Sequence, residues 1–127
     1  MANEATHIST IALEDGFGEV RIADEVVAII AGLAASEVKG VASMAGNTTR
    51  ELIEKLGMKS LSKGVKLSIE DQEVSVAINV NMKYGYNVPQ TSTEIQDKVK
   101  TAIETMTGLT VTDVNINIVN VVMDPDK

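Results

Sequence analysis

The stretch TSTEIQDKVKTAIETMTGLTVTDVNINIVNVVM, residues Thr91–Met123, is the most informative part of the sequence for the fold. Thr91 stands three residues before Glu94, which is the spacing of a capping box at the start of a helix. Apolar residues then recur at helical spacing and would form one buried face: Ile95, Val99, Ala102, Ile103 and Met106. Gly108 has the position of a C-cap. The sequence therefore predicts a helix that begins at Thr91 and ends before Gly108.

After Gly108 the period of the apolar residues changes to two, as in a half-buried strand. One face of this strand would carry Val114, Ile116 and Ile118, and the other would carry Asn115 and Asn117. Two apolar residues adjoin at Ile118–Val119, which interrupts the alternation. This slip predicts a bulge or a strand end near Asn120.

A second region with the same period lies upstream. Val65–Ile69 and Val74–Met82 each alternate apolar with polar residues, and the polar corner Glu70–Glu73 separates them. This pattern predicts a β-hairpin with one buried face. Because its other face is polar, we expect helices to cover the sheet on one side only.

The first half of the chain begins with a lead-in, residues 1–15, that is expected to be flexible and could become a short strand. Glu19–Ile22 alternates polar and apolar residues and is predicted to be a strand. Asp24 has the position of an N-cap for a helix over about residues 24–38. The buried stripe of that helix would consist of Val26, Ile29, Ile30 and Leu33.

Two short elements should follow that helix. Val41–Met44 is a strand candidate after the Lys39-Gly40 stop. Thr48 stands three residues before Glu51, a second capping box, which predicts a short helix that ends at Gly57.

The predicted order of elements is β-α-β-α-β-β-α-β, which indicates an α+β fold. We expect a single domain over residues 16–123, with a mostly antiparallel or mixed sheet, two longer helices on one face and a polar tail at 124–127. A chain of 127 residues can bury a core of its own. Aromatic residues make up only 2% of the sequence, so this core must be aliphatic.

The charge of the chain argues against one class of partner. A formal net charge of −7 is unfavourable for binding a polyanion, so no nucleic acid is expected. The N-terminus has no signal-peptide pattern, and no apolar run approaches the ~20 residues that span a bilayer. We therefore expect no direct membrane insertion, and any membrane association would be peripheral or through a partner.

Catalytic and metal-binding constellations are scarce in the sequence. His7 is the one histidine and there is no cysteine, so neither a Ser-His-Asp triad nor a His/Cys zinc site can form within one chain. The acidic pairs stand where helix caps and a hairpin corner are predicted, and they lack the spacing of a calcium loop. We expect no catalytic residue, no cofactor and no metal site.

Two groups of residues are candidates for contact with a partner. The first is a lysine cluster, Lys55, Lys59, Lys63 and Lys66, which could meet an acidic protein surface, nucleic acid or anionic lipid, or simply form a solvated face. The second is a corner with both tyrosines, Tyr84 and Tyr86, which could form a protein contact or cap the core. The sequence leaves both alternatives open.

Short motifs along the chain together form a familiar combination: Gly18–Ile22, Glu37–Val41, Lys63–Val65, Tyr84-Gly85, Ile95–Val99, Met106–Leu109 and the alternation over Val114–Ile118. In these motifs the chain resembles the alkaline-shock-protein, or general-stress-protein, family of envelope stress response proteins of Gram-positive bacteria. The resemblance covers residues 16–123, and the combination is more specific than any one motif.

This resemblance implies a non-enzymatic cytoplasmic protein that acts in cell-envelope homeostasis through protein–protein interaction or self-assembly. It implies a peripheral place at the inner face of the membrane for some relatives, through a small integral membrane anchor protein. For other relatives it implies control of acetyl-CoA carboxylase and fatty-acid synthesis, which is the alternative function here. It brings no catalytic residues to this chain.

Overall fold

The computed structural model describes residues 8–12, 18–44 and 62–123 of the 127-residue chain. The predicted helix that begins at Thr48 lies outside the described residues. So do Lys55 and Lys59 of the lysine cluster, and the tail at 124–127.

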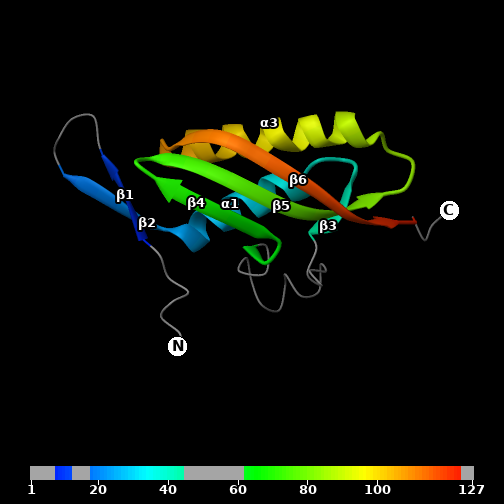
Figure 1. The fold of residues 1–127 in the computed structure, drawn as a ribbon, viewed down its shortest axis with the longest axis horizontal. Helices are drawn as coiled ribbons and strands as arrows, with labels where there is room; N and C mark the ends of the chain where they lie inside the picture. Colours follow the sequence, from blue (N-terminus) through cyan, green and yellow to red (C-terminus); the bar gives the residue numbers. More distant parts are fainter. Residues whose placement is uncertain (1–7, 13–17, 45–61, 124–127) are drawn as a thin grey trace.

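The described residues form an α+β fold, which confirms the predicted class (Figure 1). In chain order the elements are β1 (Ile8–Ala12), β2 (Glu19–Ala23), α1 (Asp24–Ser36), β3 (Val41–Met44), β4 (Val65–Glu70), β5 (Glu73–Lys83), α3 (Val88–Thr107) and β6 (Thr110–Val122). The first strand, β1, falls in the predicted lead-in and pairs antiparallel with β2 as a separate two-stranded sheet.

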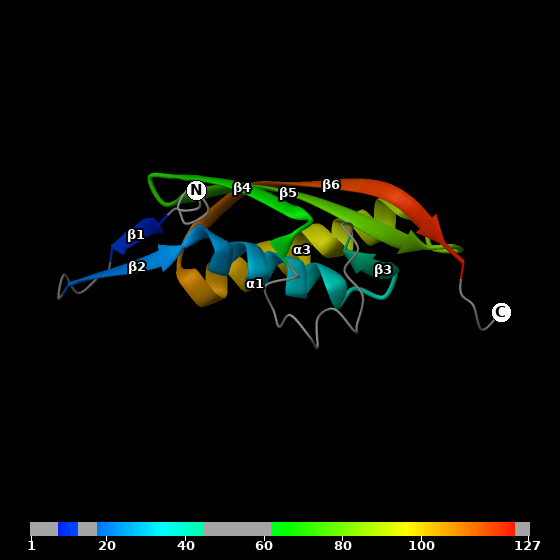
Figure 2. The same ribbon diagram turned by 90° about the horizontal axis from the view of Figure 1, so that it is seen from below.

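In the part of the chain that the structure describes, the main sheet has four strands, and β5 pairs with each of the other three. β4 and β3 pair antiparallel with successive parts of one side of β5, and β6 pairs parallel with its other side. The sheet is therefore mixed, and α3 is the crossover between its two parallel strands. Both α1 and α3 lie on the same face of the sheet, and they run side by side in opposite directions (Figure 2). The prediction of two helices on one face is confirmed.

The core lies between this helix layer and the sheet. Every second residue of β5, from Val74 to Met82, is at most 1% exposed, as the alternation predicted. Ile95, Val99 and Ile103 of α3 are fully buried against them. The pairing of β5 with β6 shifts register between Ile118 and Asn120, which confirms the predicted bulge.

The start of α3 corrects the predicted capping box. The N-cap is Asn87, whose Oδ1 accepts a hydrogen bond from the backbone N of Gln90 at 2.8 Å, and Pro89 stands in the first turn. Thr91 therefore lies inside the helix, where it is buried. A Thr-x-x-Glu spacing marks a cap only when the chain before it is not helical, and here Pro89 starts the helix earlier.

The end of α3 agrees with the prediction, except at Met106. Gly108 is the C-cap with a φ of 78°, a left-handed conformation that suits glycine. Met106, predicted to be buried, is 69% exposed. Thr107 takes the buried position instead, because its hydroxyl donates to the Ile103 oxygen at 2.6 Å and accepts from the Leu109 nitrogen at 3.1 Å.

Helix α1 corrects two further predictions. Ala23, not Asp24, is the N-cap residue, and Asp24 lies in the first turn, where its charge favours the helix dipole. The predicted buried stripe is also wrong, since Val26 is 44% exposed and Leu33 is 38% exposed. The buried face is made of smaller residues instead: Val27, Ala28, Ala31, Gly32, Ala34 and Ala35. Small side chains let α1 approach α3 and the sheet closely, and this close packing decides which face turns inward.

Candidate protein-contact surfaces

Tyr84 and Tyr86 lie in the connection between β5 and α3, as predicted. Tyr84 is 68% exposed and Tyr86 is 45% exposed. The backbone N of Tyr84 donates to the oxygen of Val122 at 2.9 Å, which joins this connection to the end of β6. The Tyr86 ring lies against the Gly40 turn, where an added Cβ would be 3.1 Å from its Cδ2. Tyr86 therefore partly covers the domain, whereas Tyr84 is turned to solvent.

Further apolar side chains are exposed at the same end of the sheet. We call the exposed apolar side chains at this end, on either face of the strands, the apolar end: Tyr84, Tyr86, Val88, Val119, Val121, Val122 and Met123. The least exposed of them, Val122, is 37% exposed. β5 and β6 meet here in register, with Met82 opposite Val121 and Lys83 opposite Val122. Clusters of exposed apolar residues on a soluble domain commonly mark contact sites, and Tyr and Met are enriched in such sites.

The lysine cluster lies away from the apolar end as far as the structure describes it. Lys63 precedes β4, and Lys66 lies on β4 in register with Ala77 of β5. Both lysines are exposed. Tyr84 follows Ala77 by seven residues of mostly extended chain, or about 20 Å. Lys66 and the tyrosines therefore belong to separate surfaces.

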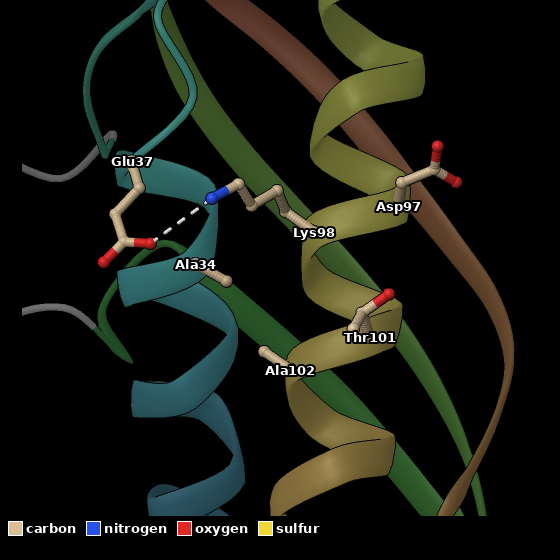
Figure 3. A pocket seen from close by; sticks show the side chains of 6 residues that line it. All are labelled: Ala34, Glu37, Asp97, Lys98, Thr101 and Ala102. Atoms are coloured by element: carbon tan, nitrogen blue, oxygen red, sulfur yellow. Dashed lines mark ion pairs between the residues drawn. The ribbon is translucent and has the colours of Figure 1, made fainter.

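A groove between α1 and α3 is a surface that the sequence did not indicate (Figure 3). Its cavity volume is about 440 Å³, and its lining residues are Ala34, Glu37, Asp97, Lys98, Thr101 and Ala102. The side chains of Ala34 and Ala102 point toward one another from the two helices. Lys98 crosses the groove, with its Nζ 3.7 Å from Oε1 of Glu37. The alanine-rich composition of α1 was the only signal in the sequence, because the groove needs the helix pairing to exist.

Two carboxylates among the described residues have shifted pKa values, and both are lowered. The backbone N of Val111 and the side chain of Lys100 both donate to Glu104 and lower its pKa. Hydrogen bonds from Thr112, Ser75 and Asn115 lower the pKa of Asp113. Both groups are thus stabilised as anions by structural partners, which is the opposite of what a general acid needs at neutral pH.

Asp113 belongs to a row of polar side chains on the open face of the sheet. Its Oδ2 accepts from Ser75 Oγ at 2.9 Å and from Asn115 Nδ2 at 2.8 Å. Further along, Asn117 Nδ2 donates to Asn79 Oδ1 at 2.9 Å across the β5–β6 pair. These bonds satisfy the asparagines that the sequence placed on the outer face.

The described residues contain neither a metal-binding cluster nor a membrane-spanning helix. Across residues 8–12, 18–44 and 62–123, no group of three His, Cys, Asp or Glu side chains is placed to hold a metal ion. In the same part of the chain no helix is both long and apolar enough to cross a bilayer.

Comparison with known proteins places the chain in a family. The model of the alkaline shock protein 23 family, described as having a cell envelope-related function, matches residues 12–123. The chain is 34% identical to the uncharacterized protein YqhY of Bacillus subtilis over 124 residues, which cover 98% of this chain and 85% of YqhY. It is also 34% identical to the uncharacterized protein Spy1535 of Streptococcus pyogenes over 108 residues, 84% of this chain and 81% of that protein.

A third relative, the uncharacterized protein YloU of Bacillus subtilis, is 31% identical over 109 residues, which cover 84% of this chain and 91% of YloU. No solved structure matches the chain. The family match spans nearly all of the described fold, including both helices and the whole main sheet. The chain therefore belongs to the alkaline shock protein 23 family, whose function is related to the cell envelope.

Proposed function

We propose that this chain is a non-enzymatic cytoplasmic protein that serves cell-envelope homeostasis by binding a protein partner or further copies of itself. The envelope relation comes from the family. The observation that carries the mode of action is the apolar end, where seven apolar or aromatic side chains at one end of the sheet are exposed. Leaving such a cluster in water is unfavourable, and burial against a partner would remove that cost.

The composition of the apolar end supports a protein contact. Tyrosine combines a large apolar ring with a hydroxyl, so it can be buried in an interface and still be hydrogen-bonded. Tyr84, the more exposed tyrosine, is held by the backbone bond of its nitrogen to Val122. A residue held in this way loses little backbone freedom when a partner covers it.

The geometry of the carboxylates supports a non-enzymatic role. Glu104 and Asp113 are the described carboxylates with shifted pKa values, and hydrogen bonds within the fold account for both. An enzyme site would instead join a shifted group to a concave pocket. The α1–α3 groove contains neither of these two carboxylates.

The candidate partners are a small integral membrane anchor protein and a second copy of the chain. An anchor would place this protein peripherally at the inner face of the membrane. The alternative, control of acetyl-CoA carboxylase and fatty-acid synthesis, would use the lysine cluster. Charge reversal at Lys63 and Lys66 tests that alternative. The alternative predicts that the variant loses carboxylase binding, and unchanged binding would exclude it.

Crosslinking and affinity purification from the native host test the proposal. Tagged wild-type protein should recover a specific protein, and the double variant Tyr84→Ser/Val121→Ser should not. Ser68→Ala, an exposed change on β4, is the control and should recover it normally. Sedimentation of the purified wild type shows whether the recovered protein is a second copy. A strictly monomeric protein that recovers no partner in any of these samples would refute the proposal.

A further inference from the structure

Methionine is the only source of sulfur in this chain, because the sequence has six methionines and no cysteine. The structure describes the side chains of three of them. Met82 of β5 is 1% exposed, whereas Met106 is 69% exposed and Met123 is 63% exposed. An oxidant must reach the sulfur of a methionine to convert it to the sulfoxide. Among these three, Met106 and Met123 are therefore accessible to oxidants, and Met82 is protected by the core.

The two exposed methionines belong to opposite ends of the domain. Met123 directly follows β6 and is part of the apolar end, next to Val122 in the chain. Met106 lies in the last turn of α3, 18 residues after Val88 of the apolar end. Eighteen helical residues extend about 27 Å, and α3 ends far from the end of β6 (Figures 1 and 2). The protein thus has one exposed methionine within the proposed contact surface and one outside it.

Oxidation of Met123 changes the chemistry of the apolar end. Hydrogen peroxide transfers one oxygen atom to the thioether sulfur, so that an S=O bond forms, the O–O bond breaks and the second oxygen leaves as water. The sulfur loses two electrons, and the peroxide gains them. An apolar thioether becomes a polar sulfoxide. Burial of a sulfoxide against apolar side chains costs free energy unless a hydrogen bond satisfies its oxygen.

We propose that Met123 is a peroxide-sensitive modification site of the apolar end, and that its oxidation to the sulfoxide weakens binding of the protein partner. The inference rests on the proposed function, because it assigns a redox control to the same contact surface. Met106 is similarly exposed but lies outside the apolar end, so its oxidation leaves binding unchanged. A methionine sulfoxide reductase reverses the effect: a dithiol is oxidised to a disulfide, and the sulfoxide oxygen leaves as water.

Limited treatment with hydrogen peroxide tests the accessibility of the site. The purified full-length protein is treated, the peroxide is removed, and peptides that contain methionine are examined by mass spectrometry for one added oxygen atom. Met106 and Met123 should gain the oxygen at similar rates, and Met82 should stay unmodified. Circular dichroism shows whether the treated protein is still folded.

Recovery of the partner from a lysate of the native host tests the effect on binding. The measured protein is the one that tagged wild type recovers and Tyr84→Ser/Val121→Ser does not. Treated wild type should bind it about tenfold more weakly than untreated wild type. Treatment should cause the same loss in Met106→Leu and no loss in Met123→Leu, each compared with its own untreated sample.

Two further samples separate the sulfoxide from general oxidative damage. Met123→Gln places a polar side chain at this position without any treatment, and it should bind as weakly as treated wild type. Incubation of treated wild type with a methionine sulfoxide reductase and dithiothreitol should restore binding.

Three results would overturn the inference. The first is undiminished binding by treated wild type in which Met123 carries the added oxygen. The second is an equal loss on treatment of Met123→Leu, because the sensitive group would then lie elsewhere. The third is binding by Met123→Gln that equals that of untreated wild type. In all three cases untreated wild type still recovers its partner and the proposed function stands, whereas no recovery by untreated wild type would refute both.

Discussion

The side chain of Gln96 on α3 donates a hydrogen bond from Nε2 to the backbone oxygen of Val114 on β6, at 3.0 Å. Glu104 on α3 accepts from the Val111 nitrogen at 3.0 Å, and Asn120 Oδ1 accepts from the Val121 nitrogen at 2.9 Å. Within the described residues β6 pairs only with β5, and these side-chain bonds satisfy three backbone groups of the strand. Covering an edge strand in this way keeps it from pairing with other chains. We therefore expect partners to contact side chains of this protein and not the backbone edge of β6.

Replacement of Gln96 tests this role of α3. Gln96→Ala removes the donor to Val114 and should lower the free energy of unfolding by about 1 kcal/mol. It should also speed aggregation at raised temperature, because the edge of β6 loses part of its cover. Urea unfolding and light scattering measure the two effects. Gln90→Ala, an exposed change on the same helix, is the matched control. Equal behaviour of the two variants would show that the bond to Val114 contributes nothing.

The Glu104 contact predicts a dependence of stability on pH. The folded-state pKa of Glu104 is lowered below its usual 4.5 by Val111 and Lys100. The charged group therefore stabilises the fold above about pH 4.5, and this contribution is lost as the pH falls through the lowered folded-state pKa. Glu104→Gln keeps an acceptor for Val111 but loses the charge.

Urea midpoints between pH 7 and pH 3 measure the effect of Glu104. The wild type should be more stable than Glu104→Gln at pH 7, and the difference should shrink below pH 4.5. Glu94→Gln, on an exposed part of α3, controls for the loss of one negative charge. A difference that stays constant over this range would exclude the proposed contribution of the charge.

The turn after α1 packs closely against the start of α3 at Gly40, where there is no room for a side chain. A Cβ at this position would stand 2.9 Å from both Cγ2 and Oγ1 of Thr91, which is buried. Gly40→Ala should therefore cost about 1–3 kcal/mol of stability. Adding Thr91→Ala should recover part of the loss, because it removes the atoms that clash.

Gly18→Ala is the control for Gly40, since nothing lies within 4 Å of its added Cβ. That variant should lose no stability. Thermal unfolding of the three variants measures the comparison. If Gly40→Ala and Gly18→Ala unfold at the same temperature, the close approach of the turn to Thr91 is not tight.

The two faces of α1 can be distinguished by a pair of substitutions. Ala31 is fully buried, so Ala31→Leu should overpack the contact with α3 and the sheet and cost about 1–3 kcal/mol. Leu33 is 38% exposed, so Leu33→Ala should cost less than about 1 kcal/mol. Urea unfolding checks both. The reverse order of effects would mean that the large aliphatic face of α1 is the buried one.

Strands β5 and β6 were predictable because the alternation of each allows one assignment of its two faces, whereas β1 lies in the predicted lead-in. The alternation of β5 fixes which residues face the helices, and Gly108 marks the one place where α3 can end with a left-handed residue. The slip at Val119 even located the bulge. In these elements local pattern and packing agree.

The helices were harder to predict, because the sequence allows two buried faces for α1 and two N-caps for α3. On α1 both the large and the small residues recur at helical spacing, and hydrophobicity favours the large ones. The close approach to α3 favours the small ones, and only the packed structure shows that Ala31 and Ala34 are inside. On α3 the Asn87-x-Pro89 pattern indicated the N-cap, but Thr91 and Glu94 have the spacing of a capping box four residues later.

Only part of the apolar end could be predicted from the sequence. Tyr84 and Tyr86 stood out as the two tyrosines of an aromatic-poor chain. Their neighbours Val121 and Val122 come from the end of β6 and reach them only through the parallel pairing with β5. For the α1–α3 groove the sequence offered only the small residues of α1, because neither helix forms the groove alone.

The central claim is that the apolar end is the surface through which this protein meets its partner. Site-specific photocrosslinking in the native host tests it most directly, with the photoreactive residue at position 84, at position 121 or at the control position 68 on β4. Positions 84 and 121 should each crosslink to the same protein, and position 68 should not. Crosslinking of equal yield at all three positions, or at position 68 alone, would contradict the claim.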